Sequence, residues 1–383
     1  MKVKSHLNFY YLNNNETNKI LDKQIQVYKI ASGLLHGIGK KKLELLLKKT
    51  NNIRSIFESS FSNLERDVGV PIKTIKKLNR GEALRLANLN YEFNVSHNIR
   101  SLFFKDESYP YQLKECKDAP IQLNLLGGIS LENRKIVAIV GTRKCAPNSR
   151  HLVDELITQL HGHNIVVVSG LAFGIDTHVH QSCLDHKVET LAVLGHGLQM
   201  IYPRQNRLLA KNILKAGGGL LSEYHCKQTP NKYSFPQRNR IIAGLADVTI
   251  VIESPLKGGA MITAELANSY SREVMAIPNS IMNESLQGGN HLIKKNEAHM
   301  LTNAMDLFEL MNWTKTPTSQ KPCFLSNDEK SLMETIQKSS EIHIDDLYDK
   351  TGIALSKIQA LLTQLELKNH IFSSPGMYYT AKA

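Results

Sequence analysis

The stretch DVTIVIESPLKGGAMITAE at residues 247–265 decides the fold, because a β-branched apolar run leads through a glycine turn into the start of a helix. The same pattern occurs in KIVAIVGTRK at 135–144 and in NIVVVSGLAFGID at 164–176. A continuous apolar run is typical of a strand that is buried on both faces of a parallel sheet. Glycine turns at the carboxyl ends of such strands expose backbone N–H groups, and helix N-termini add positive partial charge. The sequence therefore predicts that this edge of the sheet binds anions, and that the anions are phosphates.

Repetition of this pattern between residues 134 and 312 predicts a doubly wound α/β core. Parallel strands with helices between them are expected at residues 136–140, 164–168, 190–194, 219–222, 248–252 and 273–277. A connector precedes the core, and Pro110 and Pro120 exclude one continuous helix there. We expect a further strand in this connector at Leu123–Leu126.

A chain of 383 residues is long for a single domain, and its composition divides it into four parts. We expect a helical N-terminal domain at 1–100, the α/β domain at 101–312, a polar linker at 313–326 and a C-terminal domain at 327–383. The C-terminal part has three short amphipathic helices and then a β-ribbon, which is the order of a winged helix. Its recognition helix, ALSKIQALLTQLELK, has few basic residues, so we expect it to contact protein rather than DNA.

The N-terminal domain contains a glycine turn, LLHGIGK at Leu34–Lys40, between two amphipathic segments. This turn is similar to the hairpin of a helix-hairpin-helix unit, in which backbone amides face a DNA phosphate with lysines beside them. It also suits a small helical bundle in which a glycine ends one helix. The sequence leaves both interpretations open and slightly favours the bundle.

The overall charge points to a polyanionic partner. Lys and Arg total 47 against 35 for Asp and Glu, which gives a formal net charge of +12 and a pI near 9.3. No apolar run approaches the roughly 20 residues of a membrane helix, and the N-terminus lacks the core of a signal peptide. The five cysteines are scattered without CxxC spacing, which indicates neither a zinc site nor a disulfide framework. We therefore expect a cytoplasmic protein without a membrane partner.

Two loops are expected to bind phosphate through backbone amides and basic side chains. The first follows the strand at 136–140 and offers Gly141, Thr142, Arg143 and Lys144. Its arginine would clamp a phosphate in bidentate fashion or, alternatively, pair with a neighbouring carboxylate. The second loop has the composition of a phosphate cradle but no Walker lysine, and its candidate contacts are Ser169, Gly170, Ala172, Phe173 and Gly174.

Two further segments complete the predicted site. The third offers Phe235, Arg238, Asn239 and Arg240, with the arginines expected to neutralise phosphates and the aromatic ring either stacking on a base or packing in the core. Tyr233 shares this ambiguity. The fourth offers Lys257, Gly258, Gly259 and Thr263 at the top of a strand, where a helix begins at once. This loop would hold one phosphate or would be a tight turn without a ligand.

The spacing Asp176-x-His178-x-His180 must be considered as a metal site. On a helix, residues two apart point to different faces, so the two histidines would not converge on one ion. We expect no metal, and Asp176 is instead expected to cap a helix that begins at Thr177.

The motifs VAIVGTRK, VVVSGLAFGIDTHVH, SFPQRNRIIAGLADVTIVIES, KGGAMITAELA and GGNHLIKKNEAHML resemble, in order and spacing, the DprA (Smf) family of natural transformation. The resemblance covers the whole core and implies an extended Rossmann-like domain. The N-terminal helical domain, similar to SAM or helix-hairpin-helix domains, and the winged-helix-like segment suit the longer members of that family.

The same resemblance implies what the protein does. It implies a homodimer without enzymatic activity or cofactor that binds and protects incoming single-stranded DNA. It also implies loading of a RecA-type recombinase onto that strand, with single-strand-binding protein displaced or bypassed. Arg143 falls on a DNA-contacting arginine of the family.

Two enzyme classes remain as alternatives. The combination of Gly258, Gly259, Thr263 and Glu265 faintly resembles the PGGxGTxxE loop of phosphoribohydrolases that act on nucleoside monophosphates. The proline-glycine start is missing, however, and the Thr-to-Glu spacing is one residue short. A dinucleotide-binding oxidoreductase is disfavoured because the first turn lacks the glycine fingerprint and no acidic residue ends the second strand.

Overall fold

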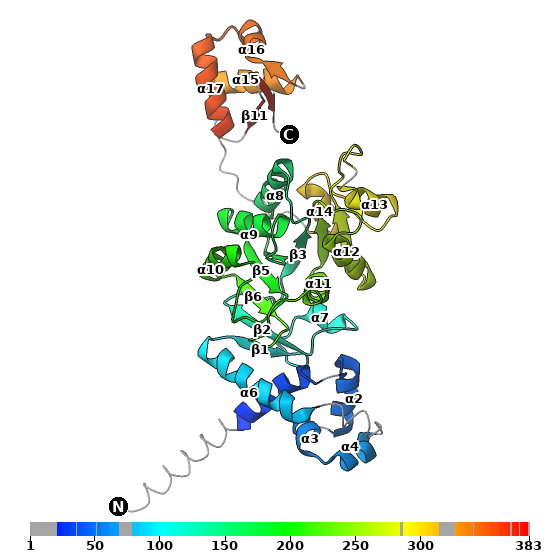
Figure 1. Cartoon of the computed structure of the whole chain (residues 1–383). Coiled ribbons are helices and arrows are strands. Elements are labelled where there is room, and N and C mark those ends of the chain that lie inside the picture. The colour runs from blue at the N-terminus through cyan, green and yellow to red at the C-terminus, as the bar shows by residue number, and fades with distance from the viewer. Residues whose placement is uncertain are drawn as a thin grey trace, which may run out of the picture. The chain divides into compact units, whose positions relative to one another are not determined.

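The computed structural model describes residues 21–35, 37–50, 52–68, 79–283, 286–313, 326–339, 341–367, 370–374 and 376–381. The chain forms two compact units, residues 1–316 and 317–383 (Figure 1). The predicted linker lies largely outside the described residues, as does His36 of the predicted hairpin. The predicted boundaries at 100/101, 312/313 and 326/327 stay predictions.

A nine-stranded sheet in the order β1-β2-β6-β5-β4-β3-β7-β8-β9 forms the centre of the larger unit. From β6 to β9 all neighbours are parallel, and β2 and β1 extend this edge as antiparallel strands. The strands are β1 (Arg100–Phe103), β2 (Gln122–Gly127), β3 (Lys135–Val140), β4 (Ile165–Ser169), β5 (Glu189–Leu194), β6 (Gly219–Ser222), β7 (Val248–Val251), β8 (Glu273–Ala276) and β9 (His299–Met300).

The predicted parallel strands and the doubly wound α/β core are confirmed, with bounds that differ by at most one residue at each end. The strand expected at Leu123–Leu126 is β2. Two strands of this sheet, β1 and β9, were not predicted. The edge strand β1 has only two apolar residues, Leu102 and Phe103, and β9 consists of two exposed residues. Neither has the buried β-branched run from which the other strands were predicted.

Alternation along β3 places its side chains in two separate cores, which explains why the run is apolar throughout. Ile136 and Ala138 belong to one buried cluster, whereas Val137 and Ile139 belong to another. The second cluster is covered by α8 (Pro147–Leu160), α9 (Ile175–Asp185) and α14 (Ala304–Leu310). The first is covered by α7 (Tyr111–Glu115), α11 (Ser234–Leu245), α12 (Gly259–Ser269) and α13 (Gly288–Lys294). A third cluster packs α10 (Arg207–Lys215) against β5 and β6.

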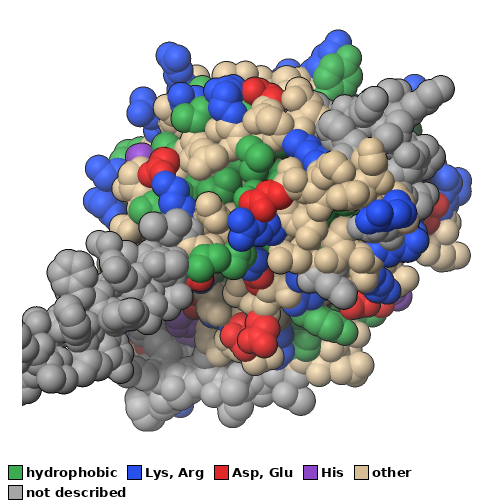
Figure 2. Space-filling view, turned by 90° about the horizontal axis from the view of Figure 1, so that it is seen from below, with side chains coloured by type: hydrophobic (Ala, Val, Ile, Leu, Met, Phe, Trp, Pro, Cys, Tyr) green, Lys and Arg blue, Asp and Glu red, His purple; other side chains and the backbone are tan. Residues whose placement is uncertain are grey.

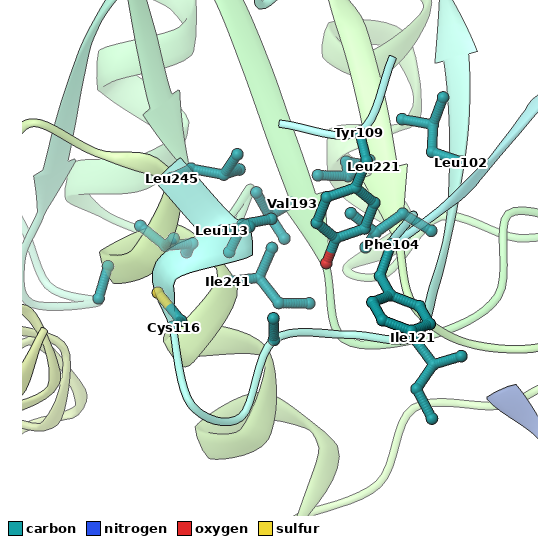
Figure 3. Close-up of a cluster of buried hydrophobic side chains, with 14 of the residues drawn as sticks. Leu102, Phe104, Tyr109, Leu113, Cys116, Ile121, Val193, Leu221, Ile241 and Leu245 are labelled. Carbon is teal, nitrogen blue, oxygen red and sulfur yellow. The ribbon is translucent and has the colours of Figure 1, made fainter. Parts of the chain in front are cut away.

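The N-terminal helices share the first cluster with the sheet. They are the helix over residues 21–33, α2 (Lys40–Thr50), α3 (Ile53–Glu58), α4 (Phe61–Val68) and α6 (Arg80–Ser96). Buried side chains such as Leu43 and Ile56 belong to the same continuous cluster as Leu123 of β2. Figure 3 shows the part of this cluster in which Leu113 of α7 and Ile241 of α11 lie beside Val193 and Leu221 of the strands.

The exposed side of α2 is basic, with Lys41, Lys42, Lys48 and Lys49 at the surface. Seen from below, Lys and Arg side chains are spread over the face of this unit, while Asp and Glu form small separate groups (Figure 2). This distribution agrees with the net charge of +12.

In its described residues, the smaller unit has three helices and a three-stranded sheet in the order β10-β12-β11. Its elements are α15 (Asn327–Gln337), β10 (Ile342–His343), α16 (Ile344–Thr351), α17 (Leu355–Leu367), β11 (Ile371–Ser374) and β12 (Tyr378–Ala381). Ser326 and Glu329 form a capping box at the start of α15, and Gly352 ends α16 at a φ of 67°. The predicted order of a winged helix is confirmed.

Ile139→Ala is expected to lower the free energy of unfolding of the larger unit by about 2–5 kcal/mol, because the side chain is fully buried and leaves a cavity. Urea unfolding followed by the fluorescence of Trp313 measures this, since the single tryptophan packs against the same cluster. Leu208→Ala is the control, because Leu208 is 68% exposed and its loss is expected to change stability by less than about 0.5 kcal/mol. An equal loss in the free energy of unfolding in both variants would contradict the assignment of Ile139 to the core.

Candidate nucleic-acid interface

A cleft lies at the carboxyl ends of β3 and β7, where the sheet topology requires one. From β3 the chain continues through β4, β5 and β6 on one side, and β7 then pairs with the other side of β3. Connections that leave in opposite directions open a crevice at the carboxyl ends of the two central strands. The cleft has a volume of about 720 Å³ and is bordered by the loop after β3, the start of α11 and the loop after β7.

The predicted contacts divide into two groups. Those that line the cleft are Gly141, Thr142, Arg143, Ala172, Phe235, Arg238, Asn239, Gly258, Gly259 and Thr263. Those that do not are Lys144, Ser169, Gly170, Phe173, Gly174, Arg240 and Lys257. The loops after β3 and β7 therefore meet as expected, whereas several individual side chains have other surroundings.

Arg143 is the arginine of the cleft that remains available to a ligand. Its side chain is exposed at the rim, and among the described residues it makes no hydrogen bond or ion pair. The alternative of a carboxylate partner therefore finds no support in this part of the chain. Lys144 and Lys257 are also exposed. Arg143 lines the cleft together with Gly259, the first residue of α12, and within the described residues this helix begins without a side-chain cap.

Aromatic rings lie at the same opening. Tyr202 is 48% exposed, Tyr233 is 68% exposed, and both are close to the cleft wall. The ring of Phe235 lies with its centroid 5.7 Å from that of Tyr202, and Lys232 places its ammonium 5.0 Å from the centroid of Tyr233. Phe173, 43% exposed, also presents its ring to solvent. Tyr202 and Lys232 were missed from the sequence because neither belongs to a glycine turn or a strand end.

Arg238 lines the cleft, but its side chain is buried and bonded to main-chain carbonyls, which argues against the expected role in neutralising a phosphate. Only 5% of it is exposed, and its Nη1 donates to the carbonyl oxygens of Gly170, at 2.6 Å, and Val193. Its Nε donates to Oδ1 of Asn239 at 3.2 Å. Burial lowers the pKa of this guanidinium, and the nearby carboxylate of Asp176 opposes that shift. Arg238 therefore joins the loop that follows β4 to the end of β5.

The second loop is held from inside, which corrects its predicted role as an open phosphate cradle. Oδ2 of Asp176 accepts hydrogen bonds from the amides of Gly170, at 3.1 Å, and Ala172, at 3.3 Å. The hydroxyl of Ser169 donates to the carbonyl of Ile139 at 2.7 Å and is fully buried. Asp176 lies within α9 rather than before it, and burial raises the pKa of its carboxyl. These groups hold the loop from inside, because their hydrogen bonds are already made within the chain.

Glycines allow the first and second loops to touch. A Cβ on Gly141 would lie 2.5 Å from Cγ1 of Ile175, and one on Gly174 would lie 2.3 Å from the carbonyl oxygen of Thr142. Gly174 also has a φ of +79°, which favours glycine. The amide of Ile175 donates to the carbonyl of Thr142 at 3.1 Å, which fixes the two loops together.

The fourth loop combines a tight turn with an open helix end. The amide of Gly258 donates to the carbonyl of Pro255 at 3.1 Å, and Asn239 Nδ2 donates to the carbonyl of Gly259 at 3.2 Å. Thr263 is 1% exposed and its hydroxyl donates to the same Gly259 carbonyl at 3.1 Å, so its predicted phosphate contact is not supported. Glu265 is exposed and does not line the cleft, whereas Thr263 does. The threonine and glutamate of the phosphoribohydrolase-like loop therefore do not lie together in the cleft.

Arg240 does not line the cleft, and its guanidinium is engaged by other groups, which argues against its predicted role in neutralising a phosphate. Its guanidinium forms an ion pair with Glu223 and donates to the carbonyl of Asp118 at 2.6 Å. The side chain of Arg240 is only 18% exposed, so removal of this arginine would leave Glu223 without its partner. Arg240→Ala is therefore expected to destabilise the fold, contrary to the interpretation of Arg240 as a surface contact.

The two histidines of α9, His178 and His180, have different surroundings. Nε2 of His178 lies 3.1 Å from Oδ1 of Asp154, whereas Nδ1 of His180 lies 2.7 Å from Oγ1 of Thr190 in the core. Burial lowers the pKa of His180 to about 3. The two side chains do not converge, as their spacing on a helix predicts.

Residues 100–312, more than half of the chain, match the sequence profile of a family described as DNA recombination-mediator protein A. The chain belongs to this family. Residues 316–377 match the profile of the DprA winged helix domain, in agreement with the fold of the smaller unit. The resemblance to DprA (Smf) proteins and the Rossmann-like fold are thereby confirmed.

Named relatives extend the comparison beyond the core. Protein Smf of Synechocystis is 30% identical, with 92% of this chain and 98% of that protein covered. DNA processing protein DprA of Streptococcus pneumoniae is 38% identical over 58% of this chain and 76% of that protein.

Two solved DprA structures have a similar fold. The X-ray structure from Streptococcus pneumoniae matches with a TM-score of 0.62 and 30% identity, covering 74% of this chain and 96% of that one. A structure from Helicobacter pylori, described by its single-stranded DNA binding mode, matches with a TM-score of 0.50 and 32% identity. It covers 56% of this chain and 97% of that one. Among the described residues, no helix of this chain is long and apolar enough to span a bilayer.

The low pKa of His180 predicts a pH-dependent stability. Because the folded pKa of about 3 lies below the unfolded value near 6.5, this contribution is complete above pH 6.5 and is lost as the pH falls toward 3. Between pH 7 and pH 5 the loss in the free energy of unfolding from this histidine amounts to about 2 kcal/mol. Urea unfolding of His180→Leu is expected to lack this part of the pH dependence, whereas His151→Leu, at an exposed position, should keep it. A His180→Leu variant as pH-sensitive as the parent protein would contradict the prediction.

Proposed function

We propose that this chain binds single-stranded DNA in the cleft at the carboxyl ends of β3 and β7 and acts as a recombination mediator. The observation that carries the proposal is the joint presence, around one opening, of exposed aromatic rings and of Arg143, which has no partner in the described part of the chain. Cations bind successive backbone phosphates, and bases stack on aromatic faces irrespective of sequence. Stacking requires unpaired bases, so this combination favours a single strand over a duplex.

Family relationships support the same proposal. The matched family is described as a DNA recombination mediator, and a 32% identical relative is described by its single-stranded DNA binding mode. We extend the proposal to a homodimer that protects incoming single strands and loads a RecA-type recombinase onto them during natural transformation. Single-strand-binding protein would be displaced or bypassed. Faster recombinase filament formation on a strand coated with that protein would test this loading.

The protein is further proposed to act by binding and without chemical turnover or a cofactor. The buried carboxylate of Asp176 is committed to the amides of its own loop, and Glu265 lies outside the cleft lining. Incubation with nucleoside monophosphates and chromatographic analysis for released base tests this. Turnover above that of a heat-treated sample would favour the phosphoribohydrolase alternative instead.

Loss of an aromatic ring at the opening is expected to weaken DNA binding. Base stacking contributes about 1–3 kcal/mol per base, so Tyr202→Ala and Tyr233→Ala should each raise the Kd for a poly-dT oligomer by about 5- to 150-fold. Fluorescence anisotropy measures the Kd. Tyr111→Ala is the control, because Tyr111 is 72% exposed on α7, outside the cleft lining. If all three variants bind alike, the strand does not stack on these rings.

Arg143 should determine part of the salt dependence of the affinity for single-stranded DNA. The logarithm of the affinity is expected to fall linearly with the logarithm of salt concentration, with a slope of about −0.7 per phosphate neutralised. Arg143→Ala should reduce the magnitude of this slope by about 0.7 and raise the Kd about tenfold at low salt. Arg85→Ala is the control, because Arg85 pairs with Glu82 on α6 and lies outside the cleft lining. An unchanged slope in Arg143→Ala would remove this arginine from the phosphate track.

A further inference from the structure

One face of α10, the helix between β5 and β6, carries a row of positive charge. Its members are Arg207, Lys211 and Lys215, which follow one another at intervals of four residues and therefore lie on the same side of the helix. All three side chains are exposed, and among the described residues none of them makes a hydrogen bond or an ion pair. We call these three residues the basic face of α10.

The charge of this basic face is not balanced by acidic residues. No Asp or Glu occurs between residues 190 and 222, so α10 has none in its first turn. Two other exposed arginines of the same unit, by contrast, have a carboxylate partner on their own helix, Arg54 in Glu58 and Arg85 in Glu82. Like charges four residues apart repel each other, and a cation in the first turn opposes the helix dipole. The basic face therefore destabilises its own helix, and a bound polyanion would relieve the repulsion.

The basic face of α10 begins beside the cleft. Tyr202 lines the cleft, and η1 (Arg204–Asn206) leads from it directly into α10. Nδ2 of Asn206 donates to the carbonyl of Leu171 at 2.9 Å, which ties the start of α10 to the loop in which Ala172 lines the cleft. Because β5 ends at the cleft edge of the sheet and the parallel β6 starts at the opposite edge, α10 runs away from the cleft along these strands (Figure 1).

The dimensions of the basic face fit the backbone of a nucleic-acid strand. At a rise of about 1.5 Å per residue, it extends about 12 Å from Arg207 to Lys215. Phosphates of one strand in a duplex follow one another at about 3.4 Å along the axis, so several of them fit within this length. Long basic side chains on an exposed helix bind phosphates without reading the bases.

We propose that a strand bound in the cleft continues along α10, where Arg207, Lys211 and Lys215 neutralise its backbone phosphates. This inference rests on the proposed function and adds a second segment to the same binding site. It predicts that the affinity depends on the length of the strand, since only a strand that extends beyond the cleft reaches the basic face.

Affinity as a function of strand length tests the proposal. Fluorescence anisotropy measures the Kd of the full chain for a series of dT oligomers, of which the shortest fills only the cleft. For the parent protein, the affinity is expected to rise further once the strand is long enough to leave the cleft. In the triple variant Arg207→Gln, Lys211→Gln, Lys215→Gln, this further rise should be lost, whereas binding of the shortest oligomers should stay unchanged.

The size of the expected effect follows from the three phosphate contacts that are lost. For the longest oligomer, the triple variant of α10 should raise the Kd at least about tenfold at low salt. The magnitude of the salt slope should fall by about 2, because each neutralised phosphate contributes about 0.7. The melting temperature of the free variant is expected to equal or exceed that of the parent protein, since the repulsion within α10 has been removed.

A second triple variant, Lys41→Gln, Lys42→Gln, Lys48→Gln, is the matched control. These lysines are exposed on α2 and do not line the cleft, so the control loses the same charge elsewhere in the same unit. Equal weakening of long-oligomer binding in both triple variants would overturn the proposal, since the net charge alone would then explain it. Normal DNA binding by the α10 variant together with lost binding of a polyglutamate peptide would overturn it in favour of an acidic protein partner.

Failure of this proposal and failure of the proposed function are distinguishable. If Arg143→Ala and Tyr202→Ala leave the binding of the shortest oligomers unchanged, the strand does not lie in the cleft and the proposed function of the cleft is wrong. If both of these variants weaken short-oligomer binding while the α10 variant keeps the length dependence of the parent protein, only the continuation along α10 is overturned.

Discussion

The buried guanidinium of Arg238 is the constraint on which the geometry of the cleft depends. It donates to the main-chain carbonyls of Gly170 and Val193, which lie after β4 and within the end of β5. A Cβ on Gly170 would lie 2.4 Å from its Nη1, so a glycine is required for the arginine to fit. Desolvation of such a charge is costly unless it is matched by hydrogen bonds and an opposite charge. The carboxylate of Asp176 supplies that charge while it holds the amides of its own loop.

Fixing the loops from inside has a consequence for binding. A rim whose polar groups are already hydrogen-bonded loses little conformational freedom when a ligand arrives, because its loops are pre-organised. The groups left for the ligand are Arg143, which has no partner among the described residues, the exposed faces of the rings and the start of α12, which has no side-chain cap there. The structural arginine and the ligand-facing arginine thus have separate roles, although both border one cleft.

The sequence predicts the sheet well because each central strand is apolar on both faces and so has an unambiguous pattern. The position of the cleft also follows from the sequence, since glycine turns mark the carboxyl ends of β3 and β7. The roles of Arg238 and Arg240 do not follow from it. Both arginines precede a strand in one helix, and their neighbours in sequence give no sign that Asp176 and Glu223 lie opposite them. Tyr202 was missed for a related reason, because its exposure depends on a loop that no motif marks.

The charge of the chain is divided unevenly between its two units, and this division limits where a polyanion can bind. Described residues 326–381 contain more Asp and Glu than Lys and Arg, although the whole chain carries a formal +12. On α17 the ammonium of Lys357 already lies 2.5 Å from Asp328. A winged helix that binds DNA normally presents free basic side chains to the phosphates. The basic excess therefore resides in the larger unit, where the cleft lies, and contact of the smaller unit with protein rather than DNA stays the prediction that its charge favours.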